Sequence, residues 1–265
     1  MAITITLTVT NNYKSNTVNT PPNQSQGARY TQTSEHTPRL RALYYDPLYR
    51  EYPNDTLVYK VESMLDSHGY NVTMALGAQA GLEELVVMDR YDVVIIRAHG
   101  AVNNRSVGFY PRGEYIYTGL YYNESLEKYG EPVREWLSEG YLAVGVIPPA
   151  GRDNLTREEL EGLPKYLVVG PKFFSSYVKA KRGSVVIVFG CDTLSKGVLA
   201  SILLDKGVSL YVGWNGSVSR SFMDRILPRV LEALLSGGAE EVRSYVDQGV
   251  IDPYSGARLD YIGDR

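Results

Sequence analysis

Short apolar runs alternate with amphipathic stretches over most of the chain. Runs rich in Val, Ile, Leu and Tyr, bounded by polar residues or glycine, predict strands at 39–45, 70–77, 91–98, 184–190 and 209–214. Apolar residues at helical spacing predict helices at 57–65 and 81–90, and a long amphipathic helix follows the last strand. This alternation predicts an α/β fold with a mostly parallel central sheet flanked by helices.

A long excursion separates the third of these strands from the fourth. It holds a tyrosine-rich stretch at 109–122, a predicted helix at 132–140, an apolar strand candidate at 141–147 and a predicted helix at 171–182. Insertions of this kind usually lie over or beside a site. The tyrosines are candidates for a substrate platform, and aromatic packing within an inserted hairpin is the simpler interpretation.

The only cysteine and one of the three histidines follow two of the predicted strands. His99-Gly100 closes the run 91–98, and Gly190-Cys191 closes the run 184–190. We expect His99 and Cys191 at one edge of the sheet, because the carboxyl ends of parallel strands meet there. Residues after Cys191 predict a helix that ends at Gly207, and both a helix N-terminus and an imidazole lower a thiol pKa. The pattern predicts a thiol nucleophile with an imidazole base, and the N–H groups of Gly100 and Cys191 are candidate donors to an oxyanion.

Structural interpretations of the same residues are simpler. A lone cysteine is often an inert buried side chain. His68-Gly69 ends an amphipathic stretch and is typical of a helix C-terminus, while His36 lies in polar sequence. His99 is therefore the remaining candidate base. One cysteine and three scattered histidines give no zinc-ligand spacing, and we expect neither a metal nor another cofactor.

The order of these features resembles the caspase-like cysteine peptidases, a group that includes caspases, legumain, clostripain, gingipains, separase and CHAT domains. The shared pattern is a strand ending in His-Gly, a strand ending in a small residue and Cys, then a helix, a strand and a long amphipathic helix. The resemblance covers roughly 39–247 and implies a three-layer sandwich, a peptidase domain at 39–250 and a cysteine endopeptidase with a His99–Cys191 dyad. Phe189 stands where caspases carry a polar residue, which argues against caspase-type aspartate specificity.

The resemblance also implies a first-subsite pocket. The matching positions hold Asp46 after the first strand, Phe189 and Asp192 beside the cysteine, and Trp214 after the next strand. A carboxylate at the bottom of an apolar slot selects Arg or Lys, and we expect Asp46 to supply it. The alternative is that Asp46 opens the turn at Asp46-Pro47 and that Asp192 caps the following helix. Peptidases of this group are activated by cleavage of flexible segments, so we expect self-processing near Arg29.

Residues 1–38 differ from the rest because they are rich in Asn, Thr, Ser, Gln and Pro, which predicts a disordered linker or stalk. The apolar start, 1–10, is either the clipped end of a membrane anchor or an ordinary strand, and 251–265 is expected to be a C-terminal tail. Asn-x-Ser/Thr sequons indicate a glycosylated extracellular or surface protein; they lie at Asn23, Asn54, Asn71, Asn104, Asn123, Asn154 and Asn215.

Charge narrows the choice of partner. The net charge of −3 and the lack of a basic patch beyond 179–182 argue against nucleic acid, and a protein or peptide substrate is expected. A flavodoxin-like binding module would carry a glycine-rich loop after the first strand, and none is present at 44–53. A caspase-like domain that acts as a catalytically silent scaffold or regulator stays open as the alternative function.

Overall fold

The computed structural model describes residues 39–103, 111–148 and 156–263 of the 265-residue chain. The chain divides between Thr37 and Pro38 into two units, and the second unit holds every described residue. The expected linker at 1–38, its apolar start and the Arg29 processing site lie outside the described residues.

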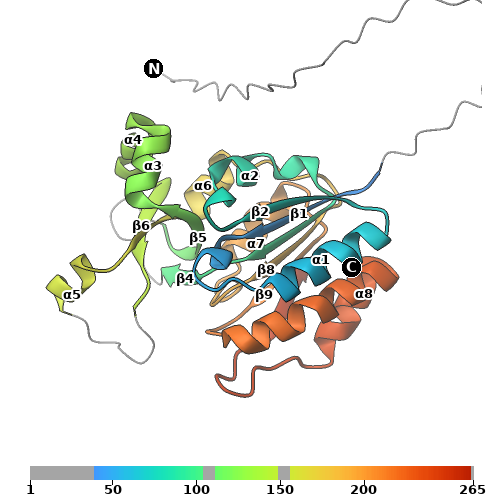
Figure 1. Ribbon diagram of the computed structural model, residues 1–265. Helices are drawn as coiled ribbons and strands as arrows, with labels where there is room; N and C mark the ends of the chain where they lie inside the picture. The colour runs from blue at the N-terminus through green and yellow to red at the C-terminus, as the bar shows by residue number, and fades with distance from the viewer. Residues whose placement is uncertain (1–38, 104–110, 149–155, 264–265) are drawn as a thin grey trace, which may run out of the picture. The chain divides into compact units, whose positions relative to one another are not determined.

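A six-stranded sheet forms the centre of the described unit (Figure 1). Five neighbouring strands are parallel, and the last strand of the chain pairs antiparallel at one edge. In spatial order the strands are β10 (Leu259–Gly263), β9 (Leu210–Trp214), β8 (Val185–Phe189), β3 (Val93–Arg97), β1 (Arg41–Asp46) and β2 (Asn71–Leu76).

Helices cover both faces of this sheet, because successive residues of its central strands point into two separate cores. One core packs the strands against α1 (Asp55–Ser67) and α8 (Arg220–Asp247). The other packs them against α2 (Leu82–Val86), α6 (Pro171–Ser176) and α7 (Val198–Asp205). The α/β class with a mostly parallel sheet between helices is therefore confirmed.

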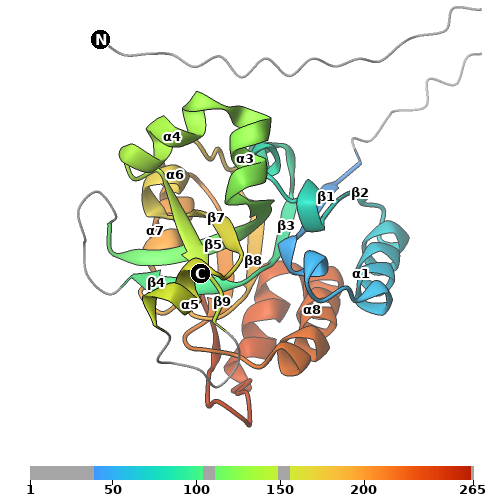
Figure 2. The ribbon, with the colours of Figure 1, turned by 60° about the vertical axis from the view of Figure 1, so that its left-hand side comes forward.

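The excursion after His99 forms a second, antiparallel sheet beside the first (Figure 2). Its strands, in spatial order, are β4 (Gly100–Asn103), β5 (Gly113–Tyr121), β7 (Lys165–Val169) and β6 (Leu142–Val146). Helices α3 (Tyr122–Tyr129), α4 (Glu131–Ser138) and α5 (Arg157–Glu161) lie in its connections. The expected helix at 132–140 and strand at 141–147 are confirmed by α4 and β6. The helix expected at 171–182 is confirmed at its start, but α6 ends at Ser176.

Several boundaries differ from those that the sequence predicts. The helix expected at 81–90 is divided into α2 and a 3₁₀ turn, η3 (Met88–Arg90). Two further 3₁₀ turns, η1 (Pro47–Arg50) and η2 (Gly77–Gln79), follow β1 and β2. Helix α8 is interrupted at Gly237 and Gly238, and the second of these has a positive φ of 68°. The tail expected at 251–265 is corrected, because β10 joins the main sheet beside β9.

Helix α7 begins later than expected because another part of the chain caps it. Residues after Cys191 form turns, and Gly197, with a φ of 67°, precedes the helix. The buried carboxylate of Glu114 on β5 accepts hydrogen bonds from the N–H groups of Lys196, Val198 and Leu199. A negative charge at a helix N-terminus is favourable, so β5 fixes where α7 begins.

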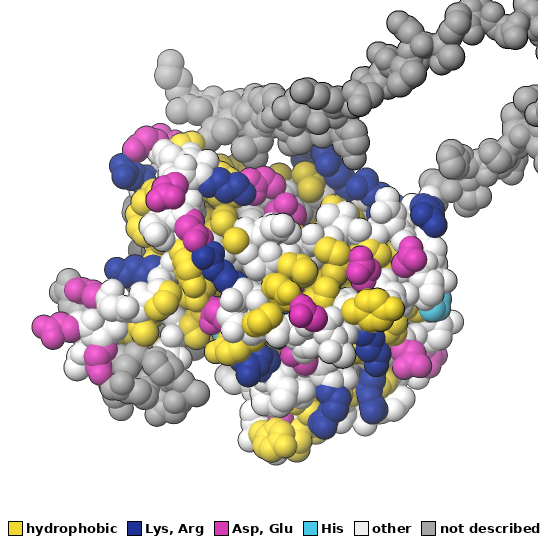
Figure 3. Space-filling view, viewed as in Figure 1, with side chains coloured by type: hydrophobic (Ala, Val, Ile, Leu, Met, Phe, Trp, Pro, Cys, Tyr) yellow, Lys and Arg dark blue, Asp and Glu magenta, His cyan; other side chains and the backbone are white. Residues whose placement is uncertain are grey.

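Positive and negative side chains are interspersed on the face shown in Figure 3, and no large patch of one sign is visible there. None of the helices in the described ranges has the combination of length and hydropathy that would let it cross a bilayer.

Candidate active site

The register of the main sheet brings His99 and Cys191 to the same edge. β3 and β8 are neighbouring parallel strands, and Arg97 at the end of one is paired with Phe189 at the end of the other. His99 and Cys191 each lie two residues beyond these paired positions. The predicted juxtaposition at the carboxyl edge is therefore confirmed.

Two glycines allow the turns after β3 and β8 to pack backbone against backbone. A Cβ on Gly100 would overlap the carbonyl oxygen of Cys191, and a Cβ on Gly190 would overlap that of Ala98. The Ala98 N–H also donates to the Phe189 carbonyl at 2.9 Å, which extends the pairing past the strand ends. Neither glycine has a positive φ, so glycine is required at these positions by the close approach of the two backbones and not by a left-handed conformation.

The turn that carries Cys191 is held by hydrogen bonds to β8 and β9. The Thr193 hydroxyl donates to the Val188 carbonyl at 2.9 Å and accepts from the Trp214 N–H at 3.0 Å. Asp192 adopts a φ of 58°, the only positive value among the described non-glycine residues, and its N–H donates to the Gly216 carbonyl. A left-handed residue beside the cysteine is strained, and such strain is frequent at functional sites.

The Cys191 thiol is partly buried and directed to a backbone carbonyl. Its Sγ donates to the Val218 carbonyl at 3.6 Å. Burial raises the pKa of the thiol above its ordinary value, and the negative charge of Asp192 adds to the increase. Within the described residues no backbone carbonyl accepts from the Cys191 N–H.

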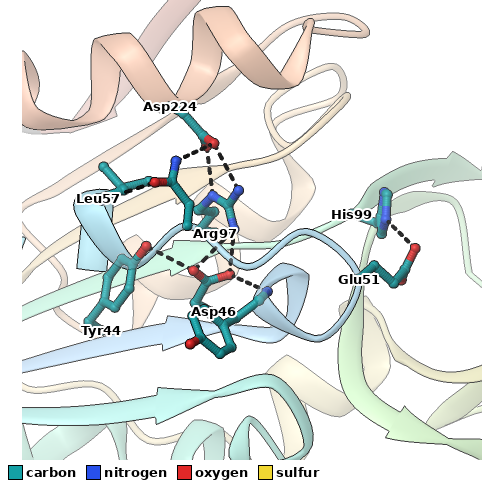
Figure 4. Close-up of polar contacts among 9 residues, drawn as sticks. Tyr44, Asp46, Glu51, Leu57, Arg97, His99 and Asp224 are labelled. Atoms are coloured by element: carbon teal, nitrogen blue, oxygen red, sulfur yellow. Dashed lines mark hydrogen bonds and ion pairs between the residues drawn. The ribbon is translucent and has the colours of Figure 1, made fainter. Parts of the chain in front are cut away.

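His99 lies between two tyrosine rings and faces a carboxylate. The ring centroids of Tyr52 and Tyr117 lie 6.1 and 6.0 Å from that of His99, both edge-on. Nε2 of His99 is 3.5 Å from Oε2 of Glu51, within ion-pair range but without hydrogen-bond geometry (Figure 4). Burial alone would raise the pKa of Glu51, but contacts with His99 and Tyr166 outweigh it and lower that pKa. The imidazole thus has an anionic neighbour that sequence reasoning missed.

The segment that carries Glu51 is anchored to the second sheet. The Arg50 guanidinium forms two hydrogen bonds of 2.6 Å with Glu124 and one of 2.8 Å with the Gly119 carbonyl. It also lies over the Tyr121 ring at 3.6 Å. The bidentate pair with Glu124 fixes the end of η1 against α3, the Gly119 bond fixes it against β5, and together they position the carboxylate beside His99.

No hydrogen bond joins His99 and Cys191 in the part of the chain that the structure describes. The side chains emerge from adjoining turns, but the thiol is directed to Val218 and the imidazole to Glu51. Catalytic pairs are often loose before a substrate binds, so this geometry is compatible with a resting dyad.

The role expected for Asp46 is corrected by its contacts. Its carboxylate is fully buried and accepts two hydrogen bonds from Nη1 of Arg97, at 2.9 and 3.1 Å (Figure 4). The Tyr44 hydroxyl and the Tyr49 N–H also donate to it, the latter as a cap of η1. Asp46 therefore opens the turn, as in the alternative interpretation. It also pairs with Arg97, a contact that the sequence did not predict, so it has no free charge for a substrate.

Arg97 links Asp46 to a second carboxylate on α8. Its Nε and Nη2 donate to Asp224 at 2.7 and 2.9 Å, and the Asn54 amide donates to the same carboxylate at 3.1 Å. Burial disfavours the charge on Arg97, but the hydrogen bonds with Asp224 and the field of Asp46 outweigh it and raise the pKa of the guanidinium. This buried network connects β1, β3, α1 and α8 beneath the site.

Phe189 and Trp214 are corrected as well, because both are fully buried. Their rings meet edge-on at a centroid distance of 5.9 Å inside the core shared with α8. Asp192 is the one partly exposed residue of the four expected in the pocket; its carboxylate accepts from the Ser195 hydroxyl at 2.7 Å. That bond lies within the turn after Cys191 and does not cap α7.

The tyrosines of the second sheet form an aromatic cluster. Tyr166 meets Tyr117 and Tyr121 edge-on at 6.0 and 5.0 Å, which fits the interpretation of aromatic packing. Over 39–103, 111–148 and 156–263 no group of three or more His, Cys, Asp or Glu side chains is placed to hold a metal ion. No protein-family model and no curated protein matches the chain.

Proposed function

We propose that the protein is a cysteine endopeptidase in which Cys191 is the nucleophile and His99 the general acid and base. The observation that carries the proposal is the paired ending of β3 and β8, which places these two residues on adjoining, tightly packed turns. The chain order of β3, His99, β8, Cys191, α7, β9 and α8 supports the resemblance to caspase-like peptidases.

The reaction follows the ordinary course of thiol catalysis. His99 takes the thiol proton, and Sγ of Cys191 forms a bond to the scissile carbonyl carbon. The carbon–nitrogen bond then breaks as His99 returns the proton to the leaving amine, and water hydrolyses the thioester. The N–H groups of Gly100 and Cys191 hold the oxyanion, and Nε2 of His99 faces Glu51 at 3.5 Å, which leaves Nδ1 for proton transfer.

The preference for Arg or Lys before the scissile bond is retained with a different acid. Asp192 follows the nucleophile directly and is close enough for its charge to affect the Cys191 pKa. A carboxylate there favours a basic side chain through charge-assisted hydrogen bonds. Asp192→Asn is expected to lower cleavage after Arg and Lys relative to Leu, Asn and Asp in matched fluorogenic peptides.

An extracellular or surface location is also part of the proposal. Of the sequons in described segments, Asn71, Asn123 and Asn215 are exposed. Asn54 instead caps α1 and bonds Asp224, so a glycan on it would disrupt the buried network. Self-processing near Arg29 would release the segment before the described unit.

The test is peptidase activity in matched variants. Cys191→Ala and His99→Ala are each expected to lower turnover by about 10³-fold or more, with the circular dichroism spectrum and melting temperature kept. Ser201→Ala, at an exposed position of α7, is the control and should retain activity. Full activity in Cys191→Ala would refute the proposal.

The alternative is a catalytically silent scaffold, and one observation favours it. The resting thiol has a raised pKa and is directed to the Val218 carbonyl, so it is not an activated thiolate. A scaffold would fail to react with a peptide-based thiol reagent at any pH, whereas a peptidase would be labelled at close to one equivalent.

A further inference from the structure

An open apolar groove lies beside His99 on the outer face of the second sheet. It has a volume of about 490 Å³, within the range of about 300–1,000 Å³ that is typical of ligand sites. The residues that line it include Ala101, Tyr115, Tyr117, Ala143, Gly145 and Val168, and no described lining residue is charged.

The strand register explains why these side chains share one face. Ala101 is paired with Tyr115, and Val168 is paired with both Tyr117 and Ala143. The alternate residues, such as Ile116 and Leu142, point into the core of the main sheet. The outer face of an antiparallel sheet is normally polar, whereas here Tyr115, Val168 and Tyr166 form a small buried cluster with Tyr117 and Ala143, and the groove lies against it.

The groove is continuous with the proposed catalytic site. Tyr117 contacts the His99 ring on one side and lines the groove on the other. Ala101 follows Gly100 directly, so β4 leads from the dyad into the groove. Gly145 is required here, because a Cβ would meet the Tyr117 ring at 2.6 Å.

The position of the general acid determines which part of a substrate would lie in the groove. The general acid must reach the leaving amine, so the residues after the scissile bond extend past His99 and away from the Cys191 turn. Charged side chains would lose hydration in a groove whose described lining residues carry no charge, whereas apolar ones gain by burial.

We propose that this groove is the leaving-group subsite of the enzyme and that it selects a large apolar side chain in the first or second position after the scissile bond. The inference rests on the proposed peptidase function and adds the class of residue that the enzyme requires on that side. It is independent of Asp192 and of the residue before the bond.

The experiment profiles cleavage of a proteome-derived peptide library by mass spectrometry. The wild type should show about tenfold enrichment of Leu, Ile, Val, Met and Phe after the cleaved bonds. Ala143→Glu, which places a carboxylate in the groove, should abolish that enrichment and favour Lys and Arg instead. Ala78→Glu, the same change at an exposed alanine outside the groove, should behave as the wild type.

Fluorogenic substrates that end in a coumarin amide carry no amino-acid residue after the scissile bond. They therefore distinguish an effect on the groove from an effect on the catalytic residues. Ala143→Glu should lose much less activity on them than on peptides with an apolar residue after the scissile bond, and Ala78→Glu should lose none. Ala101→Glu, at a lining position paired with Tyr115 on the same face, gives a second variant if Ala143→Glu does not fold. It should also lose the enrichment.

Each adverse outcome has a separate meaning. If cleavage depends on Cys191 but shows no apolar enrichment, the proposed subsite is wrong. The same holds if the enrichment is unchanged in both groove variants. In either case the proposed peptidase function is unaffected. Dimerisation that is lost in the groove variants would assign the groove to a second copy and overturn the subsite. Absence of Cys191-dependent cleavage would overturn the proposed function and the subsite together.

Discussion

Replacing Asp46 by Ala should destabilise the fold rather than alter substrate preference. The change removes two hydrogen bonds from Arg97 and one each from the Tyr44 hydroxyl and the Tyr49 N–H. The Arg97 side chain is 1% exposed, and removal of one partner of a buried ion pair costs about 3–5 kcal/mol. Asp224 still holds Nε and Nη2 of Arg97, so we expect about 3 kcal/mol.

Urea unfolding followed by circular dichroism measures this cost as the change in free energy of unfolding. A domain is stable by about 5–15 kcal/mol in total, so the loss is easily detected. Asp55→Ala removes an exposed carboxylate that also bonds Tyr49 and should cost less than about 1 kcal/mol. A cost below about 1 kcal/mol for Asp46→Ala, together with weaker cleavage after Arg and Lys, would refute this reasoning.

Three further outcomes test the site. Gly100→Ala should abolish activity and lower the melting temperature because its Cβ would overlap the Cys191 carbonyl, whereas Gly216→Ala, whose Cβ would lie 3.5 Å from its nearest neighbour, should be tolerated. Glu51→Gln should lower kcat about tenfold or more with little change in KM, and Glu51→Asp should recover part of the loss; equal kcat values would remove Glu51 from the mechanism. Alkylation of resting Cys191 by iodoacetamide should rise with pH through a midpoint above the ordinary value of about 8.5, since burial favours the neutral thiol; a midpoint below 8 would show an activated thiolate.

The strands were predictable because their signals are local. Apolar runs such as 91–98 and 184–190 coincide with β3 and β8, and the small residues after them marked the turns. Pairing at the carboxyl edge followed from parallel geometry alone, so the His99–Cys191 juxtaposition could be expected before the fold was known.

The surroundings of the dyad depend on contacts between distant residues, which no local pattern reveals. Asp46 meets Arg97 across 51 positions, and Glu114 caps α7 across more than 80. Arg97 ends an apolar run, which indicates a buried cation that must pair with a carboxylate. The sequence does not indicate which carboxylate that is. Glu51 lies in the segment 44–53, where the only feature noted in the sequence was the absence of a glycine-rich loop. Nothing in that segment indicated a contact with His99.

The second sheet was only partly predictable because its outer face is apolar too. Without polar positions in alternation, the stretch 109–122 did not show the period of a strand, although β5 occupies most of it. β7 was missed because its apolar residues, Tyr166 to Val169, run without a polar break into the helix start at Pro171.

The central claim is that Cys191 and His99 act together as a nucleophile and its base. Labelling with a peptidyl acyloxymethyl ketone, with the modified residue mapped by mass spectrometry, tests it most directly. The account predicts near-stoichiometric modification of Cys191 in the folded wild type and a rate at least about 10²-fold slower in His99→Ala. Failure to label the folded wild type, or equal labelling rates with and without the His99 imidazole, would contradict it.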